Sequence, residues 1–345
     1  MKRLLLALAL LATSGSTLLT ASCGKNEPVL HIKTWPNYFA PDTVSKFEKE
    51  AGCRVIVSKM ESSEALRTEL AGKASGYDVV FPSDEVLPDF IARGLIQKID
   101  RAKLPNAANL HPRYWGLAYD SKNEYSVPYM WGSTGIAYNK EKIPAAPESW
   151  AALWDPKNAP KVTLLDDPRE VFAAAVRADG GDPGKISAEL IGKALGRFKN
   201  WKPVAYESSP KDMLINGDAW ISQCYSGDAL QASDELKGKI GFVIPKEGGT
   251  LWVDNLCIPK AAPNRELAHK FIDYLLRADV SAAISNEVAY ANPNEAAQKL
   301  IKKDVLEDRV ANPSEEELKR CAILKEISPE VKKKLDDAWA QVKGK

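Results

Sequence analysis

Short apolar runs separated by amphipathic segments predict strands that alternate with helices over the first third of the chain. The stretch "VLHIKTW" (29–35) is typical of a strand, and "PDTVSKFEKEAG" (41–52) is typical of a helix, since Pro and Asp open it and Gly closes it. The pattern continues with strands at 53–60 and 77–82, a helix at about 63–73 and another beginning at Ser83. This order is typical of a parallel α/β sheet.

Two longer segments are expected to pass between separate lobes. Residues 124–140 are rich in strand-forming side chains and interrupted by Gly132 and Gly135, which suits a crossing from one lobe to another. Residues near 240–258 look like the return crossing. The final third is expected to be helical at 264–277, 279–287, 294–303 and 330–343. The sequence therefore predicts two discontinuous α/β lobes around a cleft, formed by residues 29–132 plus 252–305 and residues 133–251 plus 306–345.

The first 22 residues are predicted to be a secretory signal. Lys2 and Arg3 precede an apolar run that ends at Thr13 and is too short to span a membrane, and small residues then lead to Cys23. The stretch "LTASC" (19–23) resembles a bacterial lipobox, in which the Cys after the cleavage point carries the lipid that anchors the mature protein. We therefore expect lipidation of Cys23, with plain secretion as the alternative.

Charge argues against nucleic acid as a partner. The chain has 345 residues, of which 47 are Lys or Arg and 46 are Asp or Glu, and loss of residues 1–22 would remove two positive charges and no negative ones. A nearly neutral chain with no basic stripe is poorly suited to bind nucleic acid or anionic lipid. The cysteines after Cys23 form no CxxC pair and have no His at metal spacing, which argues against a zinc site. Export leaves both buried thiols and disulfides open for Cys53, Cys224, Cys257 and Cys321.

One carboxylate lies inside an apolar strand. In "GTLWVDNLCIP" (249–259), strand alternation puts Trp252 and Asp254 on one face and Val253 and Asn255 on the other. A lone buried carboxylate would be too costly to keep, so this one must face solvent, pair inside the protein or receive a cation from outside. An indole beside a carboxylate suits the last of these, because it adds a cation–π contact to the ion pair.

Six collinear motifs give the chain a resemblance to a known family. They are "TWPNYFAPDTVSKFEKEAG" (34–52), "YDVVFPS" (77–83), "YSVPYMWGSTGIAYN" (125–139), "DDPREVF" (166–172), "PKEGGTLWVDNLCIP" (245–259) and "YANPNEAA" (290–297). With these motifs the chain resembles the polyamine-binding proteins of bacterial ABC importers over nearly its whole mature length. The stretches "GDALQAS" (227–233) and "AYANPNEAA" (289–297) make the putrescine-binding branch look closer than the spermidine-binding one.

The resemblance implies a periplasmic binding-protein fold of type II-like form. In that fold two lobes close over one ligand, and the closed form docks on membrane permease subunits. The implied ligand is a polyamine such as putrescine or spermidine, and the implied location is the periplasm or the outer face of the cytoplasmic membrane. The resemblance further implies a monomer that needs no cofactor or metal and catalyses no reaction.

The resemblance also implies which residues surround the ligand. A polyamine carries two or more ammonium groups joined by methylenes, so its site needs carboxylates at amine spacing and aromatic faces between them. The amine-binding carboxylates are expected to be Asp254, Asp228 and Glu170. The full expected set, in which Ser209 is an alternative to Ser208, is Trp35, Tyr38, Ser83, Glu85, Asp167, Glu170, Ser208, Tyr225, Asp228, Trp252, Asp254 and Tyr290.

Several of these residues have a structural explanation that needs no ligand. In "DDPREVF", Asp167 is placed as a helix N-cap and Glu170 as its partner in a capping box. Ser83 is also placed to cap a helix, and an ordinary helix start would explain Asp228. Asp167 matches a ligand residue of the spermidine-binding branch only.

Four positions depart from the family pattern and bear on the choice of ligand. Pro36 replaces a residue that usually has a hydroxyl, Asn37 replaces an acidic residue, and Tyr225 replaces a Trp. Glu85 stands where the family usually presents an aromatic side chain, with Asp84 beside it. A carboxylate is thus gained on one side of the cleft where another is lost, unless these two acids only stabilise a helix N-terminus.

Other functions are less well supported by the residues. Ferric iron would need adjacent tyrosines or a cluster of His and carboxylates, which the three histidines do not supply. An exported hydrolase is disfavoured because no GxSxG or HExxH element occurs. A binding protein for another cationic amine, such as agmatine, cadaverine or an amino-acid-like cation, and a ligand-loaded sensor would have the same cleft, so these alternatives stay open.

Overall fold

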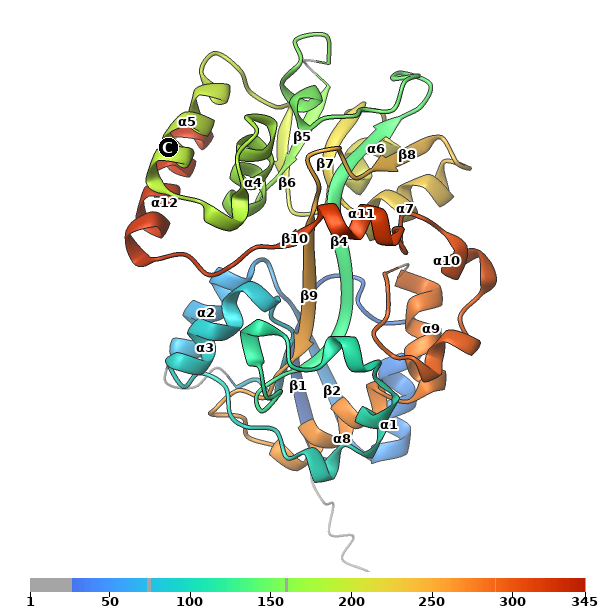
Figure 1. Ribbon diagram of the computed structural model, residues 1–345. Helices are drawn as coiled ribbons and strands as arrows, with labels where there is room; N and C mark the ends of the chain where they lie inside the picture. Colours follow the sequence, from blue (N-terminus) through green and yellow to red (C-terminus); the bar gives the residue numbers. More distant parts are fainter. Residues whose placement is uncertain (1–26, 73–75, 159–160, 289, 345) are drawn as a thin grey trace, which may run out of the picture.

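The computed structural model describes residues 27–72, 76–158, 161–288 and 290–344. The predicted signal at 1–22 and Cys23 lie outside these residues. Over the described residues the chain folds into two α/β lobes, with two long strands running between them (Figure 1). The predicted fold class is confirmed, and the predicted lobe boundaries stay a prediction.

The first lobe is built on a parallel sheet whose strands lie in the order β2 (Arg54–Lys59), β1 (Val29–Thr34) and β3 (Val79–Val80). Its helices are α1 (Thr43–Ala51), α2 (Ser63–Ala71), α3 (Leu87–Ala92), α8 (Arg265–Leu275) and α9 (Ala278–Val288), with the 3-10 helices η1 (Asp84–Val86), η2 (Arg101–Lys103), η3 (Pro105–Asn109), η4 (Pro112–Tyr114) and η5 (Ala118–Asp120). Every second residue of β1 is buried, so that Leu30 and Ile32 share one core with Phe81 and Phe271.

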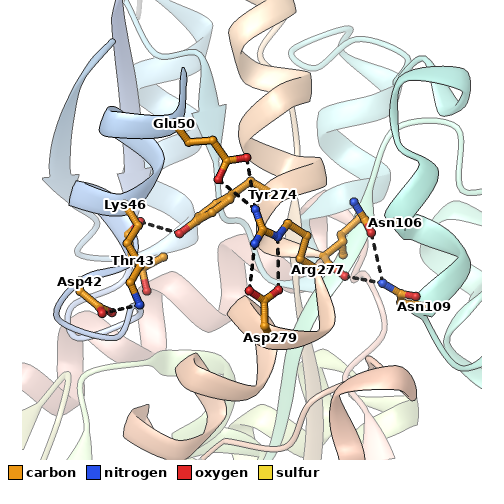
Figure 2. Close-up of polar contacts among 10 residues, drawn as sticks. Asp42, Thr43, Lys46, Glu50, Asn106, Asn109, Tyr274, Arg277 and Asp279 are labelled. Atoms are coloured by element: carbon orange, nitrogen blue, oxygen red, sulfur yellow. Dashed lines mark hydrogen bonds and ion pairs between the residues drawn. The ribbon is translucent and has the colours of Figure 1, made fainter. Parts of the chain in front are cut away.

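Arg277 and Tyr274 fix α1 to the junction between α8 and α9 (Figure 2). The Arg277 guanidinium donates to the carboxylates of Glu50 and Asp279, each at 2.9 Å, and lies over the Tyr274 ring with 5.4 Å to its centroid. The Tyr274 hydroxyl donates to the Thr43 carbonyl at 3.1 Å. The beginning and the end of α1 are therefore both held against the helices that follow the second crossing.

The second lobe is built on a mixed sheet whose strands lie in the order β10 (Ala322–Ile323), β9 (Thr250–Leu256), β4 (Val127–Asn139), β7 (Ile221–Tyr225), β5 (Val162–Leu165) and β6 (Ala205–Glu207), with β8 (Ile240–Val243) also paired to β4. Its helices are α4 (Pro168–Ala178), α5 (Ala188–Leu195), α6 (Lys211–Ile215), α7 (Ser226–Glu235) and α12 (Pro329–Lys343), with the 3-10 helices η6 (Trp150–Trp154), η7 (Pro183–Lys185) and η8 (Gly196–Phe198). Trp150, Leu164 and Phe172 are buried in its core.

The antiparallel strands β4 and β9 run through both lobes (Figure 1). The start of β4 packs into the first core through Val127 and Met130, and its end packs into the second core through Ile136 and Tyr138. The chain just after β9 forms an antiparallel bridge to Val80 of β3, which joins the crossing strands to the first sheet. The structure thus contains both crossings that the sequence predicts.

The region after α9 differs from the prediction. In place of a helix at 294–303, the structure has short elements: the Asn294 side chain caps a first turn by accepting from Ala297 N–H at 3.0 Å, but the Lys302 N–H donates to the Asn286 side chain at 2.8 Å and not to a carbonyl one turn back. The capping box of Ser314 and Glu317 begins a helix that was not predicted, and the chain then pairs with β9 in a third passage between the lobes. The elements are η9 (Ala296–Lys299), α10 (Lys303–Glu307) and α11 (Glu315–Arg320), followed by β10.

The question of disulfides is answered by the cysteine positions. Cys53, Cys224, Cys257 and Cys321 are all free thiols, and the first three are buried. Cys321 is half-buried, and its thiol donates to the Glu317 carbonyl at 3.3 Å. The open choice between thiols and disulfides therefore resolves in favour of thiols.

Two helical glycines have very different surroundings. Gly227 lies in the first turn of α7, where a Cβ would be 2.2 Å from the Tyr290 ring. Gly192 lies in α5, and a Cβ there would meet no described atom within 4 Å. Only glycine fits at the first position, whereas the second has room for a methyl group.

Alanine is expected to have opposite effects at these two positions. Gly227→Ala forces the Tyr290 ring to move and should lower the free energy of unfolding by about 1–3 kcal/mol. Gly192→Ala puts the best helix former into open space and should raise it by about 0.5–1 kcal/mol. Urea unfolding of both variants beside the parent protein tests this. A Gly227→Ala variant as stable as the parent would contradict the close contact with Tyr290.

Candidate functional site

A cleft of about 460 Å³ lies between the lobes. Its walls come from the ends of β1 and β3, from η1, from the N-termini of α4 and α7, and from β9. The structure brings all twelve residues expected around a ligand to this cleft, although their contact with a ligand stays a prediction. They are Trp35, Tyr38, Ser83, Glu85, Asp167, Glu170, Ser208, Tyr225, Asp228, Trp252, Asp254 and Tyr290.

Asp254 is held in one wall of the cleft by two hydroxyl groups. It lies in β9, lines the cleft together with Trp252 as strand alternation predicts, and is 3% exposed. The Ser83 hydroxyl donates to Oδ1 at 2.6 Å, and the Tyr38 hydroxyl donates to Oδ2. Burial raises the pKa of Asp254 to about 6, and the two hydroxyls oppose that rise because they stabilise the anion. Ser83 stands at the N-cap position of η1, as the alternative predicts, but its hydroxyl makes no capping bond there within the described residues.

Four aromatic rings form a row in the cleft, each meeting the next nearly edge-on. The centroid distances are 5.9 Å from Tyr38 to Tyr290, 5.1 Å from Tyr290 to Trp252 and 5.9 Å from Trp252 to Tyr225. The row depends on Gly132 of β4, because a Cβ there would lie 2.4 Å from the Trp252 ring. The rings offer apolar surface to methylenes and negative faces to cations.

The N-terminus of α4 forms the facing wall. Asp167 caps this helix as predicted, accepting hydrogen bonds from Arg169 N–H at 2.7 Å and Glu170 N–H at 3.1 Å. The expected capping box is not formed in full, since Glu170 Oε1 accepts from the Thr134 hydroxyl at 2.9 Å. Glu170 is 5% exposed, and its Oε2 has no hydrogen-bond partner among the described residues. Burial, followed by the charge of Asp167, raises its pKa to about 7.

Arg177, which the sequence did not single out, lies behind this wall. Its guanidinium is buried and donates to the Thr250 hydroxyl at 3.0 Å and to the Gly249 carbonyl at 2.7 Å. Burial lowers the pKa of Arg177, and the charge of Glu170 acts in the opposite sense. Arg177 therefore fastens α4 to the start of β9 and places a positive charge behind the cleft.

Two further carboxylates enter the cleft from η1. Asp84 is 3% exposed, and its Oδ1 accepts from Val253 N–H at 3.1 Å, while its Oδ2 has no hydrogen-bond partner in the described chain. Burial raises the pKa of Asp84 to about 7. Glu85 is half-buried beside it, and burial, followed by the charge of Asp167, raises its pKa to about 8. Asp84 was not in the expected set of ligand residues. In the sequence, only its position next to Glu85 indicated that it could lie in the cleft.

Asp228 lies in the first turn of α7, close to Ser209. Burial raises its pKa to about 6, against the hydrogen bond from Ser209 and the charge of Lys211. Its Oδ2 has no hydrogen-bond partner among the residues that the structure describes. A helix start explains the position of Asp228 but not this unpaired oxygen. Of the two alternative serines, both line the cleft, and Ser209 is the one that contacts Asp228.

The cleft as a whole is strongly acidic. Its lining includes one lysine, Lys59, and eight carboxylates, which are Glu61, Asp84, Glu85, Asp166, Asp167, Glu170, Asp228 and Asp254. Buried carboxylates without counter-ions are costly, and a cation from outside would remove that cost. In the described part of the chain, no group of three or more His, Cys, Asp and Glu side chains is placed to hold a metal ion. Acids spread along a row of aromatic rings suit an organic cation with several separate charges.

Comparisons with known proteins agree with this geometry. The model of the bacterial extracellular solute-binding protein family matches residues 42–312. The putrescine-binding periplasmic protein PotF of Escherichia coli is 36% identical over 361 residues, covering 98% of this chain and 96% of PotF. The spermidine/putrescine-binding periplasmic protein of the same species is 35% identical over 306 residues, covering 87% of this chain and 88% of that protein.

The solved structures agree as well. A putative spermidine/putrescine ABC transporter from Listeria monocytogenes has a TM-score of 0.87 at 30% identity, covering 92% of this chain and 99% of that one. Among the described residues, no helix has both the length and the apolar character needed to cross a membrane. The family match and these relatives span most of the chain, and the two-lobed fold is the same. The chain belongs to the bacterial extracellular solute-binding protein family.

Proposed function

We propose that this protein captures a polyamine, putrescine or spermidine, in the interlobe cleft and delivers it to the permease subunits of an ABC importer. The observation that carries the proposal is a set of buried carboxylate oxygens, on Asp84, Glu170 and Asp228, that lack a hydrogen-bond partner among the described residues. Ammonium groups supply both the missing donors and the missing charge. The names of the relatives support the same ligand class.

The proposed ligand needs both kinds of contact in this cleft. Burial of each methylene contributes roughly 0.8 kcal/mol, so the four-carbon chain of a diamine gains about 3 kcal/mol. That alone corresponds to a Kd of about a millimolar or weaker. Each charge-assisted hydrogen bond adds about 1.5–3 kcal/mol, so micromolar binding requires a carboxylate at each end of the ligand. We assign Asp254 to one end and Asp228 and Glu170 to the rest of the ligand.

The proposal places the protein in the periplasm or at the outer face of the cytoplasmic membrane, as a monomer held by a lipid on Cys23. Its task is to bind and release, without a chemical reaction. Another cationic amine, such as agmatine or cadaverine, and a role as a ligand-loaded sensor are the alternatives. A pull-down with the permease subunits separates an importer component from a sensor.

Calorimetric titration of the mature protein tests the ligand class. The panel is putrescine, cadaverine, spermidine, spermine, agmatine and neutral amino acids. We expect putrescine or spermidine to bind with micromolar or lower Kd, and neutral amino acids not to bind, because they cannot neutralise carboxylates at two separate positions. Absence of polyamine binding below about a millimolar would contradict the proposal.

Asp254→Asn removes the charge of this side chain and keeps its shape. We expect the affinity for polyamine to fall by about 10–100-fold or more, because a charge-assisted hydrogen bond of about 1.5–3 kcal/mol is lost. The stability of the empty protein should hold or rise, since a buried charge is removed. Titration calorimetry and thermal unfolding measure the two effects.

Asp166→Asn is the matched control. Asp166 lines the same cleft, but its carboxylate is paired with Lys343 at 2.8 Å, and we assign it no contact with the ligand. The affinity should therefore change by no more than about threefold, as for an exposed ion pair. Equal losses in the two variants would remove Asp254 from the site.

Binding should release protons near neutral pH. Burial raises the pKa of Asp254 and Asp228 to about 6, of Asp84 and Glu170 to about 7 and of Glu85 to about 8, so several of these carboxyls hold protons in the empty cleft at pH 7. An ammonium group stabilises the ionised form and lowers these pKa values. Polyamine affinity should therefore rise as the pH increases from about 6 to about 8 and level off above that range.

Titrations at pH 7 in buffers of different ionisation enthalpy measure this proton release. The observed enthalpy should change with the buffer, in the direction of protons leaving the protein. The same linkage has a second consequence, since raised carboxyl pKa values mean that the folded state holds more protons than the unfolded chain. The empty protein should lose stability as the pH rises from about 4, the ordinary carboxyl pKa, to about 8, the highest of the raised values. A binding enthalpy that is the same in every buffer would contradict the assignment.

A further inference from the structure

Glu85 brings a carboxylate into the cleft that the ligand contacts assigned above do not use. It lies in η1 of the first lobe and lines the cleft, half-buried. The acidic groups that act on it are Asp167 and Glu170 at the N-terminus of α4, on the facing lobe, and Asp84 beside it. Its carboxylate forms no hydrogen bond or ion pair with the residues that the structure describes. Like charges therefore face one another across the cleft at this point.

Arg169 is the cation whose charge acts on Glu85, and it forms no ion pair with Glu85 among the described residues. Its Nη2 donates to the Lys325 carbonyl at 2.5 Å in an exposed contact. The charge of Arg169 lowers the pKa of Glu85, whereas the charges of Asp167, Asp84 and Glu170 raise it. The carboxylate of Glu85 thus remains available to a cation from outside.

Two acidic positions already lie beside the aromatic row. Asp254 is at one end, where the Tyr38 hydroxyl donates to it. Asp228 follows Gly227, whose Cα lies against the Tyr290 ring, the next ring in the row, and its charge raises the pKa of that phenol in addition to burial. These two positions suit the two ammonium groups of a diamine.

A third acidic position lies at the other end of the row, where Tyr225 is the last ring. Glu170 accepts from the Thr134 hydroxyl at 2.9 Å, and Thr134 is the register partner of Tyr225 between β4 and β7. After burial, the charges of Asp167, Glu170 and Glu85 raise the pKa of the Tyr225 phenol. Glu170 is 5% exposed, and its Oε2 accepts no hydrogen bond from a described residue. Because Asp167 is engaged in capping α4, the groups left to meet a ligand here are Glu85 and Glu170, which we call the interlobe acidic pair.

We propose that the interlobe acidic pair binds a third ammonium group and that Glu85 thereby makes the cleft prefer triamines to diamines. A triamine carries one more positive nitrogen than a diamine, which matches the third acidic position along the row of rings. A diamine leaves that position without a cation, with like charges facing each other across the closed cleft. This inference rests on the proposed function and deepens it, since it names the number of charges on the ligand.

The test compares spermidine and putrescine, a triamine and a diamine, by titration calorimetry at pH 8. The wild-type protein should bind spermidine more tightly. Glu85→Gln should lower the spermidine affinity by about tenfold or more and the putrescine affinity by less than about threefold, because one charge-assisted contact is lost for the triamine only. Glu85→Asp, which keeps the charge, should retain most of the preference for spermidine.

Glu61→Gln is the matched control, since Glu61 is an exposed carboxylate that lines the same cleft and to which we assign no ligand contact. It should leave the ratio of the two affinities unchanged. The empty Glu85→Gln protein should unfold at the same temperature as the wild type or a higher one, because repulsion between like charges is removed.

The outcomes separate the two levels of the proposal. A wild-type protein that binds neither amine overturns the proposed function, and the role of Glu85 falls with it. A wild-type protein that binds both, with a ratio that Glu85→Gln leaves unchanged or shifts toward spermidine, overturns the role of Glu85 alone. An equal shift of the ratio in Glu61→Gln also overturns it, because the effect would then come from the general charge of the cleft.

Discussion

The burial of carboxylates without counter-ions is the constraint on which the rest of the cleft depends. Asp84, Glu170 and Asp254 are at most 5% exposed, and none of them forms an ion pair with a described residue. Neutral donors, namely three hydroxyls and a backbone N–H, hold these anions in position without cancelling their charge. Because these contacts come from the protein itself, they orient the carboxylates and leave their charge for a cation, from which a neutral solute gains nothing.

The crossing strands β4 and β9 let one rigid element serve both lobes. β9 carries Asp254 and Trp252 into the cleft, and β4 supports the indole through Gly132, where the absence of a side chain makes room for the ring. Gly227, on α7, makes room for the Tyr290 ring in the same way. The aromatic row therefore depends on two glycines, which leave room for the rings of Trp252 and Tyr290. These rings in turn separate the acidic residues along the cleft.

What could be predicted from the sequence follows from local geometry. Strand alternation was enough to place Asp254 and Trp252 on one face, and the capping signal at Asp167 predicted the start of α4, because both depend on near neighbours in the chain. Arg177 and Asp84 were missed because their partners, at the start and in the middle of β9, lie 72 or more residues away in the sequence. The gathering of the twelve cleft residues was expected from the family resemblance and not from their spacing.

The pairing of β10 with β9 has a mechanical consequence. Where the lobes meet, β10, β9 and β4 are hydrogen-bonded neighbours, so the chain forms a narrow ribbon of strands at the junction. Sliding one strand of such a ribbon past its neighbour would break the hydrogen bonds between them. The three strands are therefore held in register with one another where the lobes meet. Bending the junction would thus bend all three strands together, as one mechanical unit.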